Sequence, residues 1–124
     1  MAEVRIYLKG WRDSQLYADA VNDKNHARHR DAWAVHARSF EPYLPGDAVY
    51  RAITYEAFGD DLTICNVAFS RFNVGDDEIA NMYRNHGHRS LSVGDVITID
   101  GNAYTVAPLG FEPVPNFTPP NSTE

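Results

Sequence analysis

Residues 95–106 read DVITIDGNAYTV and carry the clearest local folding signal in the chain. Two runs rich in β-branched and aromatic residues flank a turn sequence, which is the pattern of a β-hairpin. If Gly101 and Asn102 form the loop, Ile99 pairs with Tyr104 and the hairpin has a wholly apolar face. A loop one residue earlier would pair Ile99 with Asn102, which is a poorer cross-strand match. The sequence therefore predicts a hairpin with Gly101 and Asn102 as its loop.

The segments before this hairpin predict further strands and about four helices. Residues 4–8 and 48–56 are rich in β-branched and aromatic residues, and each predicts a strand. Apolar residues at three- and four-residue steps predict helices over about 14–21, 26–40, 62–72 and 77–86. In the third helix we expect a buried face of Leu62, Cys65, Phe69 and Phe72. Together these elements predict an α+β fold, a small, mainly antiparallel sheet with about four packed helices and a C-terminal β-hairpin.

The chain of 124 residues has room for one core, so residues 1–114 are predicted to form a single domain. Cys65 is the only cysteine, which excludes an intramolecular disulfide and a cysteine-rich zinc site. Residues 115–124 are rich in proline and small polar residues, and we expect them to be a disordered tail.

Charge and hydropathy limit the partners that the chain can have. A formal net charge of -6 argues against general binding to a nucleic-acid backbone, which needs clustered Lys and Arg. No apolar run approaches the roughly 20 residues that cross a bilayer, and the N-terminal residues lack the apolar stretch of a signal peptide. We therefore expect a cytoplasmic protein without a membrane partner.

A basic and aromatic patch in the first half of the chain is the strongest candidate for a contact surface. Arginine and aromatic residues are the usual anchors of protein interfaces, although a solvated helix face with Trp33 in the core would read the same way. An acidic partner protein is one ligand that this patch fits, and single-stranded nucleic acid is another. The candidate contacts are Trp11, Arg28, His29, Arg30 and Trp33.

Residues with catalytic or metal-binding chemistry are present but have simpler explanations. His86 and His88 could share a metal with His26, His29 or His36, yet surface or helix-end histidines give the same sequence. Cys65 lies among apolar residues and reads as a core thiol rather than a nucleophile. The acidic clusters at residues 60–61 and 76–78 fit helix capping. No cofactor and no catalytic residue are predicted.

Three segments carry a resemblance to a known family: FNVGD at 72–76, HRSLSVGDVI at 88–97, and the pair Gly110-Phe111. They resemble the YodL-like domain, and small actinobacterial plasmid and phage proteins with an Arg-Ser-Leu-Ser-Val-Gly-Asp-Val signature. The likeness covers residues 54–114, and it implies a phage or mobile-element accessory protein without a defined reaction. We interpret the turn and signature residues as fold-defining: Asn73, Gly75, Ser90, Ser92, Gly94, Asp95 and Gly101.

The function expected from the sequence is binding of a host macromolecule, with protein favoured over nucleic acid. One alternative is a small histidine-dependent metal enzyme or hydrolase. Another is an acidic decoy that imitates nucleic acid through the Asp-rich second half. The sequence leaves the oligomeric state open.

Overall fold

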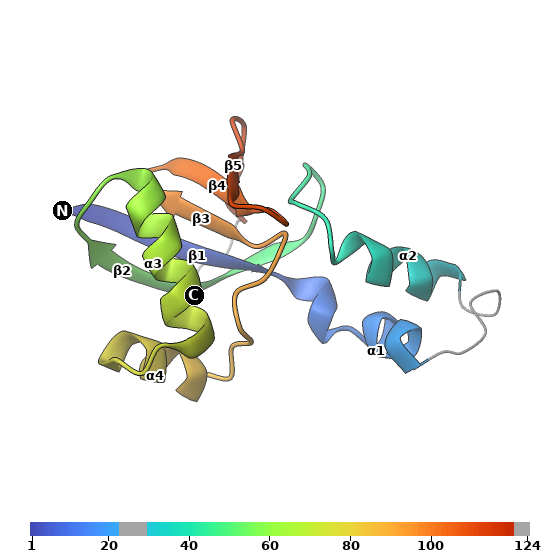
Figure 1. The fold of residues 1–124 in the computed structure, drawn as a ribbon. Helices are drawn as coiled ribbons and strands as arrows, with labels where there is room; N and C mark the ends of the chain where they lie inside the picture. Colours follow the sequence, from blue (N-terminus) through green and yellow to red (C-terminus); the bar gives the residue numbers. More distant parts are fainter. Residues whose placement is uncertain (23–29, 121–124) are drawn as a thin grey trace.

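A computed structural model describes residues 1–22 and 30–120 of the chain, and its strands form one antiparallel sheet (Figure 1). The order of the strands in this described part is β2-β1-β3-β4-β5. The strands are β1 (Ala2–Lys9), β2 (Val49–Ala57), β3 (Val96–Ile99), β4 (Asn102–Val106) and β5 (Phe111–Pro113). The α+β fold and its mainly antiparallel sheet are confirmed.

The helices divide into two pairs that lie in different places (Figure 1). The pair α3 (Asp61–Val74) and α4 (Glu78–Asn85) packs against one face of the sheet. The pair α1 (Gln15–Asn22) and α2 (Arg30–Arg38) follows a short 3-10 helix, η1 (Gly10–Asp13), and lies beyond the end of the sheet. Residues 26–29 of the predicted second helix lie outside the described residues.

Helix starts agree with the sequence because short-range side-chain bonds set them. Ser14 Oγ accepts a hydrogen bond from the Tyr17 amide at 3.1 Å. Asp60 and Asp77 cap α3 and α4 by accepting bonds from the amides three residues later, both at 2.8 Å. The helix-capping interpretation of these acids is confirmed.

The main core lies between α3, α4 and one face of the sheet. β1 contributes Val4, Ile6 and Leu8, which alternate toward this core as a strand requires. On α3 the buried residues are Ile64, Cys65, Ala68 and Phe72. The prediction of Cys65 and Phe72 was right, but Leu62 and Phe69 are exposed. The small side chain of Ala68 lets α3 lie close to the sheet. The face of α3 that packs on the sheet is therefore the one that contains Ala68, and the larger Leu62 and Phe69 lie outside it.

The hairpin register was predicted wrongly. β3 pairs Ile97 with Tyr104 and Ile99 with Asn102, so the loop residues are Asp100 and Gly101. Both have positive φ, 48° and 90°, as a type I′ turn requires, and Asp-Gly is a favoured pair for that turn. The two registers are offset by two residues and place the same side chains on the same faces. The pattern of apolar residues therefore fits both registers equally well, and the geometry of the Asp100-Gly101 turn determines which one forms.

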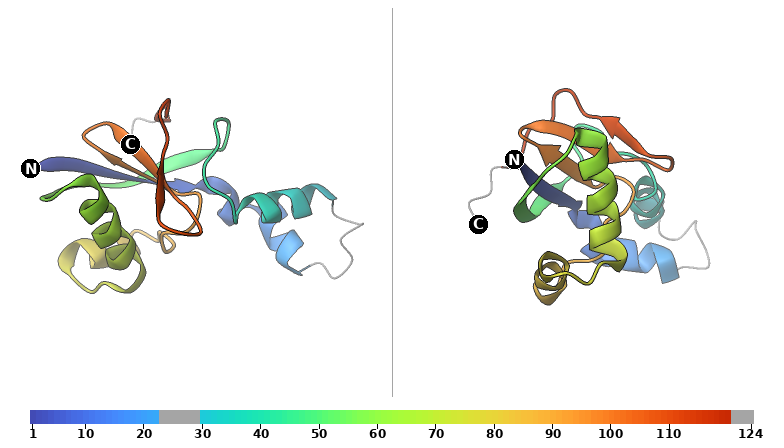
Figure 2. Two further views of the ribbon diagram at one scale, coloured as in Figure 1. Left: turned by 45° about the horizontal axis from the view of Figure 1, so that its top comes forward. Right: turned by 60° about the vertical axis from the view of Figure 1, so that its left-hand side comes forward.

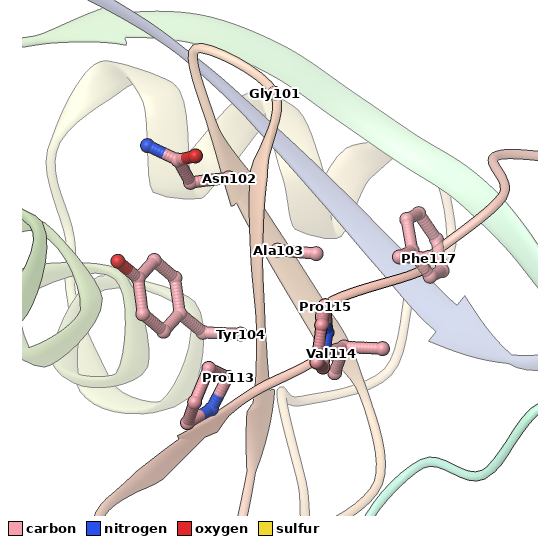
Figure 3. A pocket seen from close by; sticks show the side chains of 8 residues that line it. All are labelled: Gly101, Asn102, Ala103, Tyr104, Pro113, Val114, Pro115 and Phe117. Carbon is pink, nitrogen blue, oxygen red and sulfur yellow. The ribbon is translucent and has the colours of Figure 1, made fainter.

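The second face of the sheet is covered by the segment that follows β4. β5 adds a fifth strand that the sequence analysis missed, and the Val114 amide donates to Ala103 O at 2.9 Å. Residues 114–117 then lie on the same side of β4 as Ala103, opposite to Tyr104 (Figure 3). Phe117 packs edge-on against Tyr7 and Tyr43, with ring centroids 5.2 and 5.4 Å apart. For Phe117, the prediction of a disordered tail does not hold.

Removing the tail should therefore cost stability, although the sequence alone predicts no change. We expect truncation after Pro115 to lower the free energy of unfolding by about 1–2 kcal/mol, because the half-buried Phe117 loses its apolar contacts. Truncation after Thr118 retains that ring and serves as the control. Urea denaturation of both proteins measures the difference, and equal midpoints would show that Phe117 contributes nothing to the fold.

No helix in residues 1–22 and 30–120 is long and apolar enough to cross a membrane.

Candidate functional site

Residues 10–22 and 30–48, which we call the arm, connect two strands that are neighbours in the sheet. β1 and β2 pair along their whole length, so a short turn would be enough to join them. The chain instead forms η1, α1 and α2 between them, and the two helices extend away from the sheet (Figures 1 and 2). The arm is thus an insertion that the sheet does not need for its own connection.

An aromatic cluster holds α1 and α2 together. The His36 ring lies at the centre, with ring centroids 5.6 Å from Tyr17, 5.0 Å from Trp33 and 4.9 Å from Phe40. Buried Ala20 allows close contact between the helices. The interpretation of Trp33 as a residue that packs inside the helix pair therefore has support, although its side chain keeps partial exposure.

Apolar and basic side chains of the arm are exposed to solvent. Leu16 on α1 is 48% exposed, and Phe40 just after α2 is 55% exposed. Arg30, the first described residue of α2, is exposed as well. Two of the predicted contacts, Arg28 and His29, lie outside the described residues. Arg30 and Trp33 are one helical turn apart, so the structure brings these two candidates to the same part of the arm.

Trp11, by contrast, belongs to the base of the arm. The Nζ atom of Lys9 lies 4.4 Å from the centroid of the Trp11 ring, and the Arg38 guanidinium carbon lies 5.9 Å from it. These are cation–π contacts that join η1 to the end of β1 and the end of α2. The predicted contact residue Trp11 therefore has a structural role here.

Lys9 is fully buried at this base, and the sequence analysis gave no sign of it. Its ammonium donates to the backbone oxygens of Glu41 at 2.9 Å and Arg38 at 3.3 Å, and lies 3.5 Å from the Asp47 carboxylate. Burial lowers the pKa of the Lys9 ammonium to about 8. Lys9 thus connects the segment between α2 and β2 to the end of β1. The sequence pattern predicts an exposed lysine at the end of an alternating strand, so the burial of Lys9 is evident only from the tertiary structure.

The Arg-Ser-Leu-Ser-Val-Gly-Asp-Val signature forms the other half of the base. Asp95 is fully buried and accepts two bonds from the Arg89 guanidinium, at 2.7 and 2.8 Å. The same carboxylate accepts bonds from the amides of Lys9 at 2.9 Å and Ser92 at 2.7 Å. Arg89 also donates to Lys9 O at 2.9 Å. The signature residues therefore lock the loop before β3 onto the end of β1.

The other signature and turn residues also act locally. The Ser92 hydroxyl lies 3.4 Å from Ser90 O. Asn73 donates to Leu91 O at 3.1 Å and joins the end of α3 to the signature loop. A Cβ atom on Gly75 would lie 2.6 Å from Arg71 O, so glycine is needed for close backbone approach there. Each of these contacts is made within the domain, and the interpretation of these residues as fold-defining stays a prediction.

The described residues bring no third metal-ligating side chain to His86 and His88. The rings of His86 and His88 are 6.2 Å apart, and the described part of the chain holds no group of three or more metal-ligating side chains. Two of the histidines considered as further ligands, His26 and His29, lie outside this part, and His36 belongs to the aromatic cluster of the arm. Cys65 is buried, which confirms a core cysteine, and burial raises the pKa of its thiol to about 12.

Comparison of the chain with protein-family models, curated proteins and solved structures finds no match. The arm exposes Leu16, Phe40 and Arg30 on an insertion that the sheet does not need for its own connection. Its base is built from buried charged groups. This arrangement makes the arm the candidate functional site.

Proposed function

We propose that this protein is a phage or mobile-element accessory protein that binds a host protein through the arm. The observation that carries the proposal is a helix pair, inserted between neighbouring strands, that extends from the sheet and exposes Leu16 and Phe40. Exposed apolar residues on an inserted element are typical of protein-binding surfaces.

The chemistry of the arm favours a protein partner over nucleic acid. A nucleic-acid surface needs many cations to neutralise phosphates, whereas this chain has a net charge of -6. The described arm exposes apolar side chains and Arg30, and a partner that offers apolar side chains and carboxylates would complement them. The negative net charge of the chain would repel a phosphate backbone.

The origin in a phage or mobile element is supported by the resemblance of the Arg89–Val96 signature to YodL-like domains and to small plasmid and phage proteins. The Arg89–Asp95 bonds connect segments of the domain, so we infer only the origin of the protein from the signature. The binding role is inferred from the arm. In this proposal the signature fixes the base from which the arm extends, and the arm supplies the contacts.

Two variants of the arm test this proposal. Leu16→Glu places a charge on the apolar surface, and Arg28→Glu with Arg30→Glu reverses the basic end. Each protein, immobilised, is incubated with host lysate, with and without nuclease treatment, and retained proteins are quantified by mass spectrometry. We expect a protein retained by the wild type to be depleted at least tenfold by both variants, while circular dichroism shows unchanged folding.

Leu109→Glu is the matched control, because Leu109 is 93% exposed on the loop between β4 and β5 and lies outside the arm. This variant should retain the partner at the wild-type level. Equal retention by all four proteins would contradict the proposal. Retention that disappears on nuclease treatment would assign the arm to nucleic acid instead.

A further inference from the structure

β2 lies at the edge of the sheet, and this edge is long. Among the described residues β2 (nine residues, Val49–Ala57) pairs with β1 alone, through eight residues, and a bulge leaves Ala52 without a partner in β1. An edge strand of this length presents backbone N–H and C=O groups on its outer side and can pair with a further extended chain. The opposite edge of the sheet, β5, has three residues. The described sheet therefore has one edge long enough to accept another strand.

A groove of about 530 Å³ follows the outer edge of β2. Arg5 and Thr54 pair on the face opposite to the core residues Ile6 and Ile53, whereas α4 lies on the core side, so a cavity lined by both lies against the strand's edge. Side chains of α4 form the other wall, and two β1 residues complete the lining. The lining residues are Glu3, Arg5, Arg51, Ala52, Ile53, Thr54, Met82 and His86.

The two sides of this groove differ in chemistry. On the helix side, Met82 is 45% exposed beside the half-buried Ile53, which offers apolar contact. On the side of β1, the partly exposed Arg5 pairs with Glu3 at 3.2 Å, and Arg51 brings a second guanidinium to the lining. Two arginines against one glutamate favour a carboxylate of the ligand on this side. An extended chain presents alternate side chains to these two sides.

We infer that the groove between β2 and α4 binds an extended segment of a partner protein, which adds to the sheet as a sixth strand. Alternate residues of that segment are apolar, toward Met82 and Ile53, and acidic, toward Arg5. Backbone pairing along β2 supplies the affinity, and the two sides of the groove supply the side-chain preference. This site is separate from the arm and does not rest on the function proposed for it.

The probe is a displayed library of random ten-residue peptides, selected on the wild-type protein and counter-selected on Met82→Lys. We expect enrichment of peptides that alternate apolar with acidic residues and lack proline at central positions. The most enriched peptide, made synthetically, should bind Met82→Lys and Arg5→Gln at least tenfold more weakly than the wild type. Hydrogen exchange of the β2 amides should slow when this peptide is bound.

Two control variants keep the sites apart. Leu109→Lys adds the same charge at an exposed apolar position away from the groove, and Leu16→Glu alters the arm; both should bind the peptide like the wild type. Failure to enrich any peptide over the counter-selection, or equal binding by Met82→Lys, would overturn the inference. A dimer in sedimentation velocity that Met82→Lys abolishes would overturn it too, because the edge would then belong to a second copy.

Discussion

Asp95→Ala is expected to lower the free energy of unfolding by about 3 kcal/mol. Asp95 is fully buried, and its carboxylate accepts four hydrogen bonds, two from Arg89 and two from backbone amides. Removing one partner of a buried ion pair leaves the other charge uncompensated, which costs about 3–5 kcal/mol. The Arg89 side chain retains 19% exposure, so the lower end of that range applies. Urea denaturation followed by tryptophan fluorescence measures the loss.

Glu112→Ala removes a carboxylate from the exposed surface of β5 and is the control for the change in net charge. It should shift the free energy of unfolding by less than about 0.5 kcal/mol. The loss of unfolding free energy in Asp95→Asn should lie between those of Glu112→Ala and Asp95→Ala, because an amide oxygen can still accept some of the hydrogen bonds. A cost below about 1 kcal/mol for Asp95→Ala would show that the signature does not lock the fold as described.

The elements that the sequence predicts well are those set by residues close together in the chain. Alternation marks β1 and β2, and capping side chains three residues from their partner amides mark the starts of α1, α3 and α4. Such signals need no knowledge of the rest of the molecule. They define the fold class, and they place Cys65 and Phe72 in the core.

The hairpin register and the tail show where local pattern stops being informative. Offsetting the register by two residues leaves every side chain on the same face, so burial cannot choose between the alternatives. Phe117 reads as part of a polar tail because its partners, Tyr7 and Tyr43, are far away in the sequence. The first error comes from weighing cross-strand pairs above the Asp100-Gly101 turn signal, and the second from weighing Phe117 only against its neighbours in the chain.

The candidate site also contains residues that the sequence predicted and residues that it did not. Trp33 and Arg30 were predicted as contacts, and both lie on the arm. The base depends on contacts between distant residues, such as the bond from the Lys9 amide to Asp95, 86 positions apart. A buried lysine needs several acceptors at once, and no spacing in one segment reveals that they converge. The groove beside β2 was missed because an edge is a property of strand order, which the sequence did not establish.

Gly94→Ala is expected to destabilise the protein by about 3 kcal/mol, because two costs act at this position. Gly94 has a φ of 92°, a region in which an L side chain costs about 1–2 kcal/mol. A Cβ there would also lie 2.4 Å from Lys9 Cε and 2.7 Å from Glu41 O. The backbone oxygen cannot move without disturbing the base of the arm, and overpacking of this kind costs about 1–3 kcal/mol.

Gly87→Ala separates these two costs. Gly87 has a similar φ of 83°, but nothing lies within 4 Å of an added Cβ. Its cost should be the conformational part alone, about 1 kcal/mol. Urea denaturation of both variants therefore gives, by difference, the cost of crowding Lys9 and Glu41. Equal destabilisation by the two substitutions would mean that the buried lysine can move aside, and that the base of the arm is less tightly packed than its contacts indicate.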